Sequence, residues 1–434
     1  MSAMNQPIAF FNGQWISASA AAISLDDAGF VQGTAVAEQL RTFGGKLFRL
    51  REHLARLAYS LEIVSVEPGM TLDELAGIAE ELAARNHALL PPGDDLGLSI
   101  VVTPGVYPTF APPAQGDSPI SVDTEIGTVP QPRPIVCLHT YRLPFHLWVK
   151  KYREGQRLVT TGVEQVSQRC WPPALKCRSR MHYYLADRQA AAIDPQARAL
   201  LLDAQGFVVE ASTANVLIYR GKGLLSPPLS KILHGISLSV VTELAGQLGI
   251  PFTERDLTID DLSAADEVLL TSTSVCILPV TQLNGRPIGA GRPDRTFSEL
   301  MRAWSALVGL DIIAQAELQA HAKVETRIRN TRDGTSHQGE SLSPASEEAT
   351  RQGLEHTANS SGNHGVALQG GAKSGALSGD SAPIDPDLAA VVAAWPTLPE
   401  ATRQSIVAAV KVATADRPAN GPRQGVGLPA RPNG

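Results

Sequence analysis

The sequence predicts an α+β protein with a small N-terminal α/β part, a larger C-terminal α/β part with a barrel-like sheet, and a disordered tail. Segments with strand and helix patterns are mixed and do not strictly alternate, which disfavours a doubly wound sheet. A Pro-rich polar stretch at 104–134 separates two blocks of such segments. Four regions follow: a small domain with its linker at 1–130, a large domain at 131–312, a disordered linker at 313–383, and a short helical segment with a disordered end at 384–434.

The first block opens with short strands and tight turns. Residues 10–16 form an expected β-hairpin, because Asn12-Gly13, a dipeptide typical of hairpin turns, lies between two apolar runs. Gly44-Gly45 separates 37–43 from 46–50 in the same manner. We therefore expect two hairpins in the N-terminal part.

Helical periodicity follows the second turn. From Arg51, apolar side chains recur at helical spacing, at Leu54, Leu57, Ala58, Leu61 and Ile63. Thr71 and Glu74 mark the start of a second helix that runs to about Asn86. Leu96–Thr103 is the strand expected before the linker.

The second block contains both kinds of element. Strands are expected at Ile135–Tyr141, Ala199–Leu202, Phe207–Glu210, Val216–Tyr219 and Glu267–Thr271, and helices at Arg180–Ala192, Ser237–Leu248 and Thr296–Val308. Residues 330–383 have almost no large apolar side chains, so burial cannot offset the entropy of ordering and we expect disorder. An apolar patch from Leu388 to Ala413, interrupted by Trp395–Pro399, predicts two small helices around a Pro turn.

Composition excludes several classes of protein. The 434 residues carry 37 basic and 43 acidic side chains, so global charge gives no argument for nucleic acid or membrane binding. No apolar run is long enough for a transmembrane helix, and residues 1–7 lack the features of a signal peptide. The four cysteines show no CxxC spacing, which is typical of free thiols in the cytoplasm. We expect a cytoplasmic protein that binds no nucleic acid, no membrane and no metal.

Lys176 is the first candidate for chemistry. It follows the apolar run Trp171–Leu175, which favours partial burial, and it precedes the helix expected from Arg180. A lysine at a helix start is usually a solvated surface charge. A partly desolvated lysine, however, loses proton affinity and can form a Schiff base with an aldehyde cofactor.

Glu210 is the second candidate, because it ends an apolar strand and is followed by Asn215. In an arbitrary protein such a carboxylate caps a turn. It also has the chemistry to keep a pyridine nitrogen protonated, which makes the ring an electron sink. Lys176 and Glu210 are thus two of the three things that a pyridoxal phosphate enzyme needs from its protein.

The third is a phosphate site, for which there are two short stretches and an arginine. Gly235-Ile236-Ser237 opens a helix, where backbone N–H groups and a hydroxyl favour an anion. Thr271–Ser274 provides four hydroxyls after an apolar strand, and Arg56 can pair with a phosphate. Each signal alone is more often a cap, a turn or a surface charge.

In this order, these residues resemble the motifs of the class IV (fold-type IV) pyridoxal phosphate enzymes. That family includes branched-chain aminotransferases, D-amino acid aminotransferases and aminodeoxychorismate lyases. Further matching stretches are Asn12-Gly13, Asp27–Gly33, Glu52–Leu57, Ala265–Val268, Ile277–Val280, Asn284-Gly285 and Ile288-Gly289. The resemblance covers about residues 8–310. It implies a small N-terminal α/β domain, a larger C-terminal domain, an active site between them and a homodimer.

The resemblance also implies roles at the matching positions. Lys176 would be the Schiff-base lysine and proton shuttle, and Glu210 would pair with the pyridine nitrogen of pyridoxal 5′-phosphate. The remaining cofactor-binding residues would hold its phosphate: Arg56, Gly235, Ile236, Ser237, Ser272 and Thr273.

Three positions depart from common family patterns and bear on the substrate. Phe30 stands where many members have tyrosine, so a hydroxyl near the substrate is missing. Thr109 begins the stretch where D-amino acid aminotransferases carry an Arg-x-His carboxylate trap, which counts against D-specificity. Transaminases usually have a tyrosine near the cofactor's phenolic oxygen four or five residues after the lysine, where this chain has Arg180 and Met181, and the lyase has arginine four residues after it. Tyr141 or Arg142 are alternative sources of that contact.

Three functions remain open at this point. The first is amino-group transfer between a 2-oxo acid and an amino acid, by default a branched-chain or other hydrophobic L-amino acid. The second is elimination of pyruvate from aminodeoxychorismate on the same cofactor, which the motifs do not separate from the first. The third is a non-catalytic relative whose tail, Leu388–Ala413 with Trp395, docks a partner as a helix in a groove.

Overall fold

The computed structural model describes residues 6–110 and 133–320, together with residue 402. The chain divides into two compact units, Met1–Thr357 and Ala358–Gly434, and all described residues except 402 belong to the first. The expected disorder at 330–383 lies outside the described residues. Apart from residue 402, so do the expected helices between Leu388 and Ala413.

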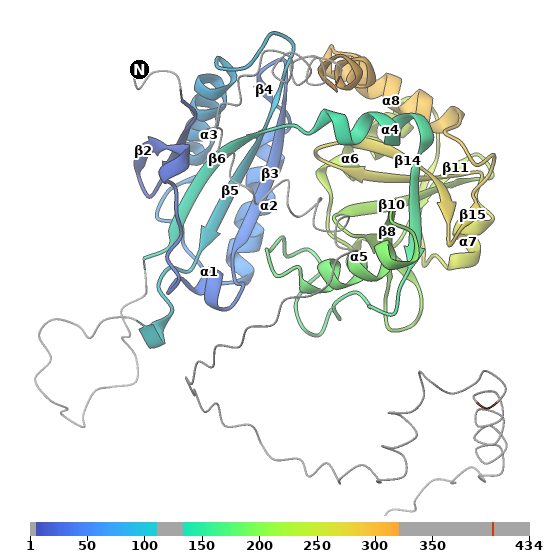
Figure 1. Cartoon of the computed structure of the whole chain (residues 1–434), viewed down its shortest axis with the longest axis horizontal. Coiled ribbons are helices and arrows are strands. Elements are labelled where there is room, and N and C mark those ends of the chain that lie inside the picture. Colours follow the sequence, from blue (N-terminus) through green and yellow to red (C-terminus); the bar gives the residue numbers. More distant parts are fainter. Residues whose placement is uncertain (1–5, 111–132, 321–401, 403–434) are drawn as a thin grey trace, which may run out of the picture. The chain divides into compact units, whose positions relative to one another are not determined.

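The first part of the chain forms a six-stranded antiparallel sheet (Figure 1). Both expected hairpins are confirmed, and at the first turn Asn12 and Gly13 take left-handed φ values of 47° and 86°. The strands, in their order across the sheet, are β2 (Gln14–Ser17), β1 (Ile8–Phe11), β6 (Ile135–Arg142), β5 (Leu96–Thr103), β3 (Val36–Phe43) and β4 (Lys46–Leu47).

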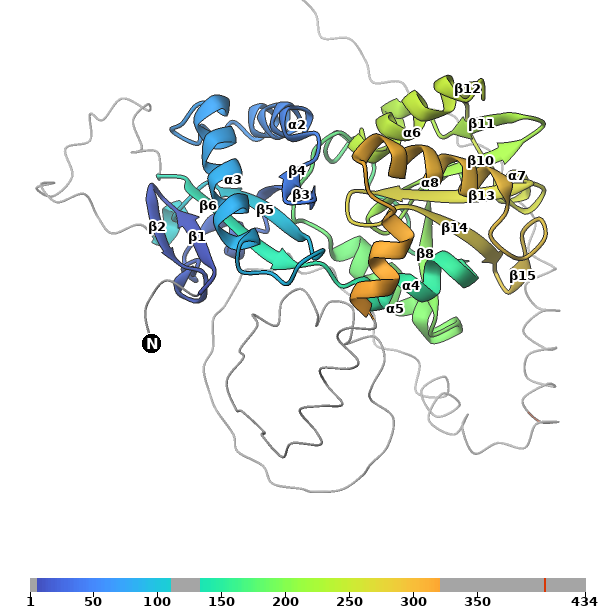
Figure 2. The ribbon, with the colours of Figure 1, turned by 90° about the horizontal axis from the view of Figure 1, so that it is seen from above.

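Two helices, α2 (Leu50–Ile63) and α3 (Leu72–His87), pack against this sheet (Figure 2). Their apolar stripes are buried and form a core with the strands, as the spacing of Leu54, Leu57 and Leu61 predicts. The start of α3 is also confirmed, since Thr71 and Glu74 form a complete capping box. A short helix, α1 (Ala28–Val31), lies between β2 and β3 in the sequence.

The strand at Ile135–Arg142 corrects one expectation. It falls after the linker and was assigned to the second block, but β6 pairs with β5 along its whole length and with β1. The chain therefore returns to the first sheet before it enters the second. The sequence pattern does not predict which sheet this strand joins, because the partners of a strand depend on contacts between residues far apart in the sequence.

The second sheet contains a closed ring of six strands, which confirms the barrel-like expectation. Each strand pairs with the next, and β9 pairs back to β10. The ring consists of β10 (Ala214–Arg220), β13 (Glu267–Ser272), β14 (Cys276–Leu283), β7 (Gln156–Thr160), β8 (Ala197–Leu202) and β9 (Val208–Ala211). Three short strands extend it: β11 (Gly223–Ser226), β12 (Phe252–Glu254) and β15 (Arg286–Pro287).

Helices pack around the barrel (Figure 1). They are α4 (Phe145–Glu154), α5 (Met181–Ile193), α6 (Ile236–Gln247), α7 (Ile259–Ser263) and α8 (Arg295–Val308), and residues 312–320 are also helical. The sequence did not predict α4, β7 or β14. Pro279 inside β14 argues against a strand by pattern alone, and β7 is short and partly polar.

Candidate active site

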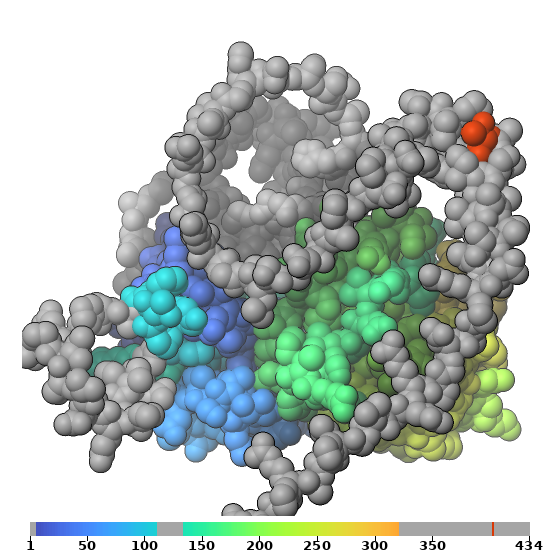
Figure 3. Space-filling view, turned by 90° about the horizontal axis from the view of Figure 1, so that it is seen from below, coloured from blue at the N-terminus to red at the C-terminus, as the bar shows by residue number. Residues whose placement is uncertain are grey.

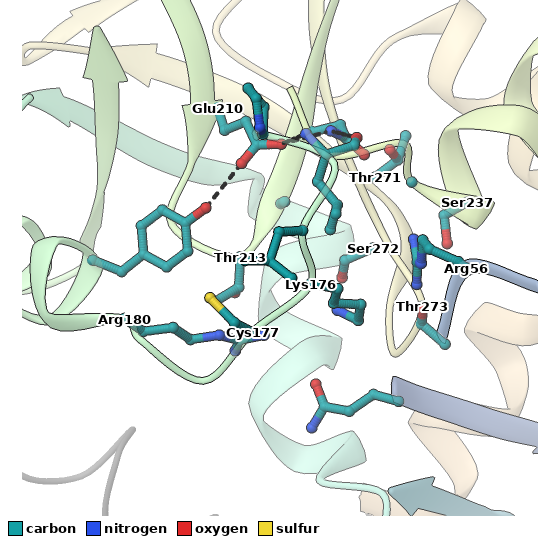
Figure 4. Close-up of a pocket in the computed structure, with 18 of the residues that line it drawn as sticks. Arg56, Lys176, Cys177, Arg180, Glu210, Thr213, Ser237, Thr271, Ser272 and Thr273 are labelled. Carbon is teal, nitrogen blue, oxygen red and sulfur yellow. Dashed lines mark hydrogen bonds between the residues drawn. The ribbon is translucent and has the colours of Figure 1, made fainter. Parts of the chain in front are cut away.

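One pocket collects most of the residues that the sequence singled out (Figure 4). Its lining includes Arg56, Lys176, Arg180, Glu210, Gly235, Ile236, Ser237, Ser272 and Thr273. Phe30 and Thr109 do not line it. Phe30 lies on α1 with 66% of its surface exposed, and Thr109 is exposed in a short 3-10 helix, Pro108–Phe110.

Lys176 lies in an extended segment that precedes helix α5, as the helix expected from Arg180 implies. Its carbonyl accepts a hydrogen bond from the Ala37 N–H at 3.1 Å, and Arg178 N–H donates to the Ala35 carbonyl at 2.7 Å. Helix α5 begins only at Met181. Pairing with the start of β3 therefore fixes the backbone of the lysine, and this holds the side chain in the pocket.

The charge of Lys176 is destabilised by its surroundings. Burial, and then the positive charge of Arg56, lower the pKa of Lys176 to about 7, although Glu38 opposes the shift. A large share of the amine is consequently uncharged near neutral pH. An uncharged amine is the form that can attack a carbonyl carbon.

Glu210 is buried on β9 and held by three donors. Its Oε1 accepts from Leu233 N–H at 2.7 Å and from Asn215 Nδ2 at 3.0 Å, and its Oε2 accepts from the Tyr183 hydroxyl at 2.9 Å. Burial raises the pKa of Glu210 to about 7, even though the bonds from Leu233 and Tyr183 oppose the shift. This carboxyl can therefore share a proton with a basic group near neutral pH.

Arg56 is fixed by a buried ion pair that the sequence did not reveal. Its Nε and Nη2 donate to the two carboxylate oxygens of Glu38 at 2.7 and 2.8 Å, and its Nη1 donates to the His234 carbonyl at 2.7 Å. His53 Nδ1 also lies 2.7 Å from Glu38. Burial alone would raise the pKa of Glu38, but Arg56 and His53 outweigh it and hold that pKa well below its usual range.

The residues expected to hold a phosphate gather on one side of Lys176. Ser237 lies in the first turn of α6, whose N-cap is Gly235, and Ser272 ends β13. Figure 4 shows Ser237, Arg56 and Thr273 together on the side of Lys176 away from Arg180. Free N–H groups of a helix start, three hydroxyls and a guanidinium form a site suited to a phosphate.

Two further observations concern the polar groups and the close packing at the pocket. Thr271 lines the pocket, and its buried hydroxyl has no hydrogen-bond partner among the described residues. A Cβ at Gly235 would lie 2.0 Å from Asn215 Oδ1, so only glycine permits this close approach. The pocket thus offers an amine, a buried carboxyl and a phosphate site, which fit a cofactor with a carbonyl, a basic ring nitrogen and a phosphate.

Comparison with known proteins identifies the family. Residues 35–283 match the family described as Amino-transferase class IV. A putative branched-chain-amino-acid aminotransferase of Methanocaldococcus jannaschii is 31% identical over 282 residues, which are 64% of this chain and 88% of that protein. A D-alanine aminotransferase of Bacillus licheniformis is 28% identical over 65% of this chain and 90% of its own length.

Solved structures show the same fold. The branched-chain aminotransferase of the archaeon Thermoproteus uzoniensis, solved with norvaline, superposes with a TM-score of 0.59 at 25% identity, covering 70% of this chain and 95% of that one. Another branched-chain amino acid aminotransferase, solved with pyridoxamine 5′-phosphate, superposes over the same shares with a TM-score of 0.60 at 24% identity. The chain therefore belongs to the class IV aminotransferases, which depend on pyridoxal phosphate. It is an enzyme of amino-group transfer, with relatives named for branched-chain amino acids and for D-alanine.

The described residues contain no group of three His, Cys, Asp or Glu side chains arranged to hold a metal ion. Among the helices that the structure places, none combines the length and apolarity needed to cross a membrane. Tyr183 and Glu38 are site residues that the sequence did not indicate, since neither belongs to a matching stretch. His53 lies within the matching stretch Glu52–Leu57, but its contact with Glu38 was not expected.

Proposed function

We propose that this chain binds pyridoxal 5′-phosphate in the pocket and transfers an amino group between a hydrophobic L-amino acid and a 2-oxo acid. The observation that carries the proposal is the joint position of Lys176 and Glu210 in one pocket, beside a phosphate site. Apolar side chains of Val166, Trp171 and Leu175 also line the pocket and suit an apolar substrate side chain. Branched-chain amino acids are the class named for several of the relatives.

Each residue has a defined task in this proposal. Pyridoxal phosphate, when bound, supplies an electron sink for the charge that develops at the substrate Cα. The Nζ of Lys176 would hold the cofactor in the resting enzyme and, once the amino group of the substrate has displaced it, would be the base that takes the proton from Cα. Glu210 holds the pyridine nitrogen in its protonated form. Arg56, Ser237, Ser272 and Thr273 bind the phosphate, together with the N–H groups of Gly235 and Ile236.

Amino transfer can be separated from elimination by its need for an acceptor. We expect purified enzyme with pyridoxal phosphate to convert L-leucine, L-isoleucine or L-valine into the 2-oxo acid only when 2-oxoglutarate or pyruvate is present. A chromatographic assay of both products measures this. Pyruvate released from aminodeoxychorismate without any acceptor would instead support the lyase, for which Arg180 in the pocket is the favouring feature. A preference for D-alanine would contradict the L-amino acid assignment.

We further propose a homodimer, supported by exposed apolar side chains in the N-terminal part. Leu25, Phe30 and Phe110 are 74, 66 and 54% exposed, and exposed apolar side chains that form one patch mark a surface for association. The space-filling view shows the residues near position 110, in cyan, standing out from the surface (Figure 3). We expect light scattering to give twice the chain mass of 46.0 kDa, and Phe30→Ser with Phe110→Ser to lower that mass. A wild-type protein of one chain mass would exclude the dimer.

The cytoplasmic location expected from the cysteines remains a prediction, as do the domain limits. All four cysteines are free thiols in the structure, in accord with a reducing compartment.

A further inference from the structure

Arg180 presents a guanidinium to the pocket that no part of the described chain neutralises. It is the N-cap residue of α5, and Figure 4 shows its side chain reaching beneath Lys176 toward Cys177. No hydrogen bond or ion pair joins this guanidinium to another described residue. Its neighbours differ: Arg56 is paired with Glu38, and Arg178 donates to Ser99 Oγ at 3.1 Å.

The surroundings of Arg180 add positive charge to this corner of the pocket. Burial, and then the charge of Arg180, lower the pKa of Arg178 to about 10, so the two guanidinium groups lie close enough to repel each other. Arg180 also helps to lower the pKa of Lys176. Glu210 is near enough to respond to Arg180, but its oxygens already accept from three donors. The described residues therefore provide no counter-ion for Arg180 in this part of the pocket.

The phosphate does not fill this place, because its proposed site lies on the other side of Lys176. The groups that remain are those of the substrate. Every amino acid and 2-oxo acid carries an α-carboxylate, and a guanidinium binds a carboxylate through two parallel N–H···O bonds. The free end of Arg180 lies near the lysine that would take the proton from Cα, so a carboxylate on that carbon can reach it.

We propose that Arg180 is the receptor for the α-carboxylate of both the amino acid and the 2-oxo acid. This rests on the proposed function and adds a selection rule to it: the site takes substrates with a carboxylate on the reacting carbon and discriminates against simple amines. The arginine takes no proton from the substrate. It fixes the orientation of Cα above Lys176.

The test compares ligands that differ only in the carboxylate. Calorimetric titration of the cofactor-loaded enzyme with 4-methylpentanoate and with its uncharged amide, 4-methylpentanamide, measures binding without turnover. We expect Arg180→Gln to weaken the acid roughly 30- to 100-fold, the loss expected for a bidentate charge-assisted pair, and to change the amide less than threefold. Arg180→Lys should restore part of the affinity for the acid. Arg169→Gln, which removes an exposed arginine of the preceding loop, should change neither.

A single-turnover experiment provides a second readout. L-Leucine and 3-methylbutan-1-amine carry the same amino group and side chain, but only leucine has the carboxylate. Conversion of the bound cofactor, followed by absorbance, should slow for leucine in Arg180→Gln and stay unchanged for the amine. Because the side chain has no partner among the described residues, the variant should unfold at the wild-type temperature.

Several results would overturn the proposal. Equal affinity of wild-type enzyme for the acid and the amide would do so, as would unchanged binding of the acid in Arg180→Gln. A variant that binds the acid normally but shifts the pH at which the cofactor absorbance changes would place Arg180 at the phenolic oxygen of the cofactor instead. Failure of the proposed function appears separately, as wild-type protein that shows no cofactor absorbance. In that case the cofactor-free protein would be titrated with 4-methylpentanoate, and weaker binding to Arg180→Gln than to wild type would still support the role of Arg180.

Discussion

Replacing Lys176 by alanine should lower the rate of amino transfer by roughly 10⁴-fold, because the cofactor attachment point and the proton-transfer group are lost together. The variant should still bind pyridoxal phosphate through Arg56 and the start of α6, with a weaker Kd. Initial rates with L-leucine and 2-oxoglutarate measure the first effect, and fluorescence titration measures the second. A residual rate above about a hundredth of wild type would contradict the role given to Lys176.

Lys151 provides a matched control for this substitution. It lies on α4, outside the pocket lining, and burial and then the charge of Arg198 lower its pKa to about 8. It is therefore another lysine with reduced proton affinity, but one without access to the cofactor. We expect Lys151→Gln to keep the transfer rate within a few-fold of wild type.

The pH dependence of cofactor attachment follows from the same lysine. Its pKa lies near 7, so the reactive uncharged form predominates above pH 7 and falls about tenfold for each pH unit below it. Stopped-flow absorbance of apoenzyme mixed with pyridoxal phosphate should show attachment slowing in that direction. A rate that keeps rising tenfold per unit up to pH 10 would show that the lysine has an ordinary pKa.

Replacing Glu38 by glutamine should destabilise the protein by about 3–5 kcal/mol. The change leaves the Arg56 charge in a buried site without its counter-ion, and losing one partner of a buried pair has this cost. Cofactor affinity should fall as well, because glutamine has only one acceptor oxygen and Arg56 loses at least one of the two bonds that Glu38 accepts from it. Urea denaturation of the apoenzyme measures the first effect and cofactor titration the second.

Glu52 is the matched control, since it also pairs with an arginine but on the surface. Its carboxylate lies 2.9 Å from Arg49, and 45% of its side chain is exposed. Glu52→Gln should therefore cost less than about 1 kcal/mol. The depressed pKa of Glu38 also determines how stability depends on pH. The stabilisation from Glu38 is fully present above the usual pKa of a glutamate and is lost as the pH falls toward its lowered pKa in the folded protein. Equal losses for the two variants would contradict a structural role for Glu38.

The turns, the helix cap and the amphipathic helix of the N-terminal part can be predicted from the sequence. Hairpins with Asn12-Gly13 and Gly44-Gly45, the capping box at Thr71 and the apolar stripe of α2 are all present as expected. These features depend on neighbours within a few residues, which is why pattern reasoning finds them. Strand β14 was missed because Pro279 breaks the pattern, and β6 was assigned to the wrong sheet because its partners are distant in sequence.

The site also combines residues found from local motifs with residues placed by contacts between distant parts of the chain. Lys176, Glu210, Arg56 and the two hydroxyl stretches follow from ordered motifs, and the structure places them around one pocket. Glu38 and Tyr183 belong to no such motif, and the motif that contains His53 does not indicate its contact with Glu38. Their parts arise from burial and from contacts across the fold, as when Tyr183 on α5 donates to Glu210 on β9. The position of a single glutamate or tyrosine in the sequence does not predict such a contact.

Chemical trapping shows whether Lys176 carries the cofactor. Wild-type enzyme loaded with pyridoxal phosphate would be reduced with borohydride, digested with protease and analysed by mass spectrometry. We expect a single pyridoxyl adduct on the peptide that contains Lys176. An adduct on another lysine, or none on a protein that has bound the cofactor, would contradict it.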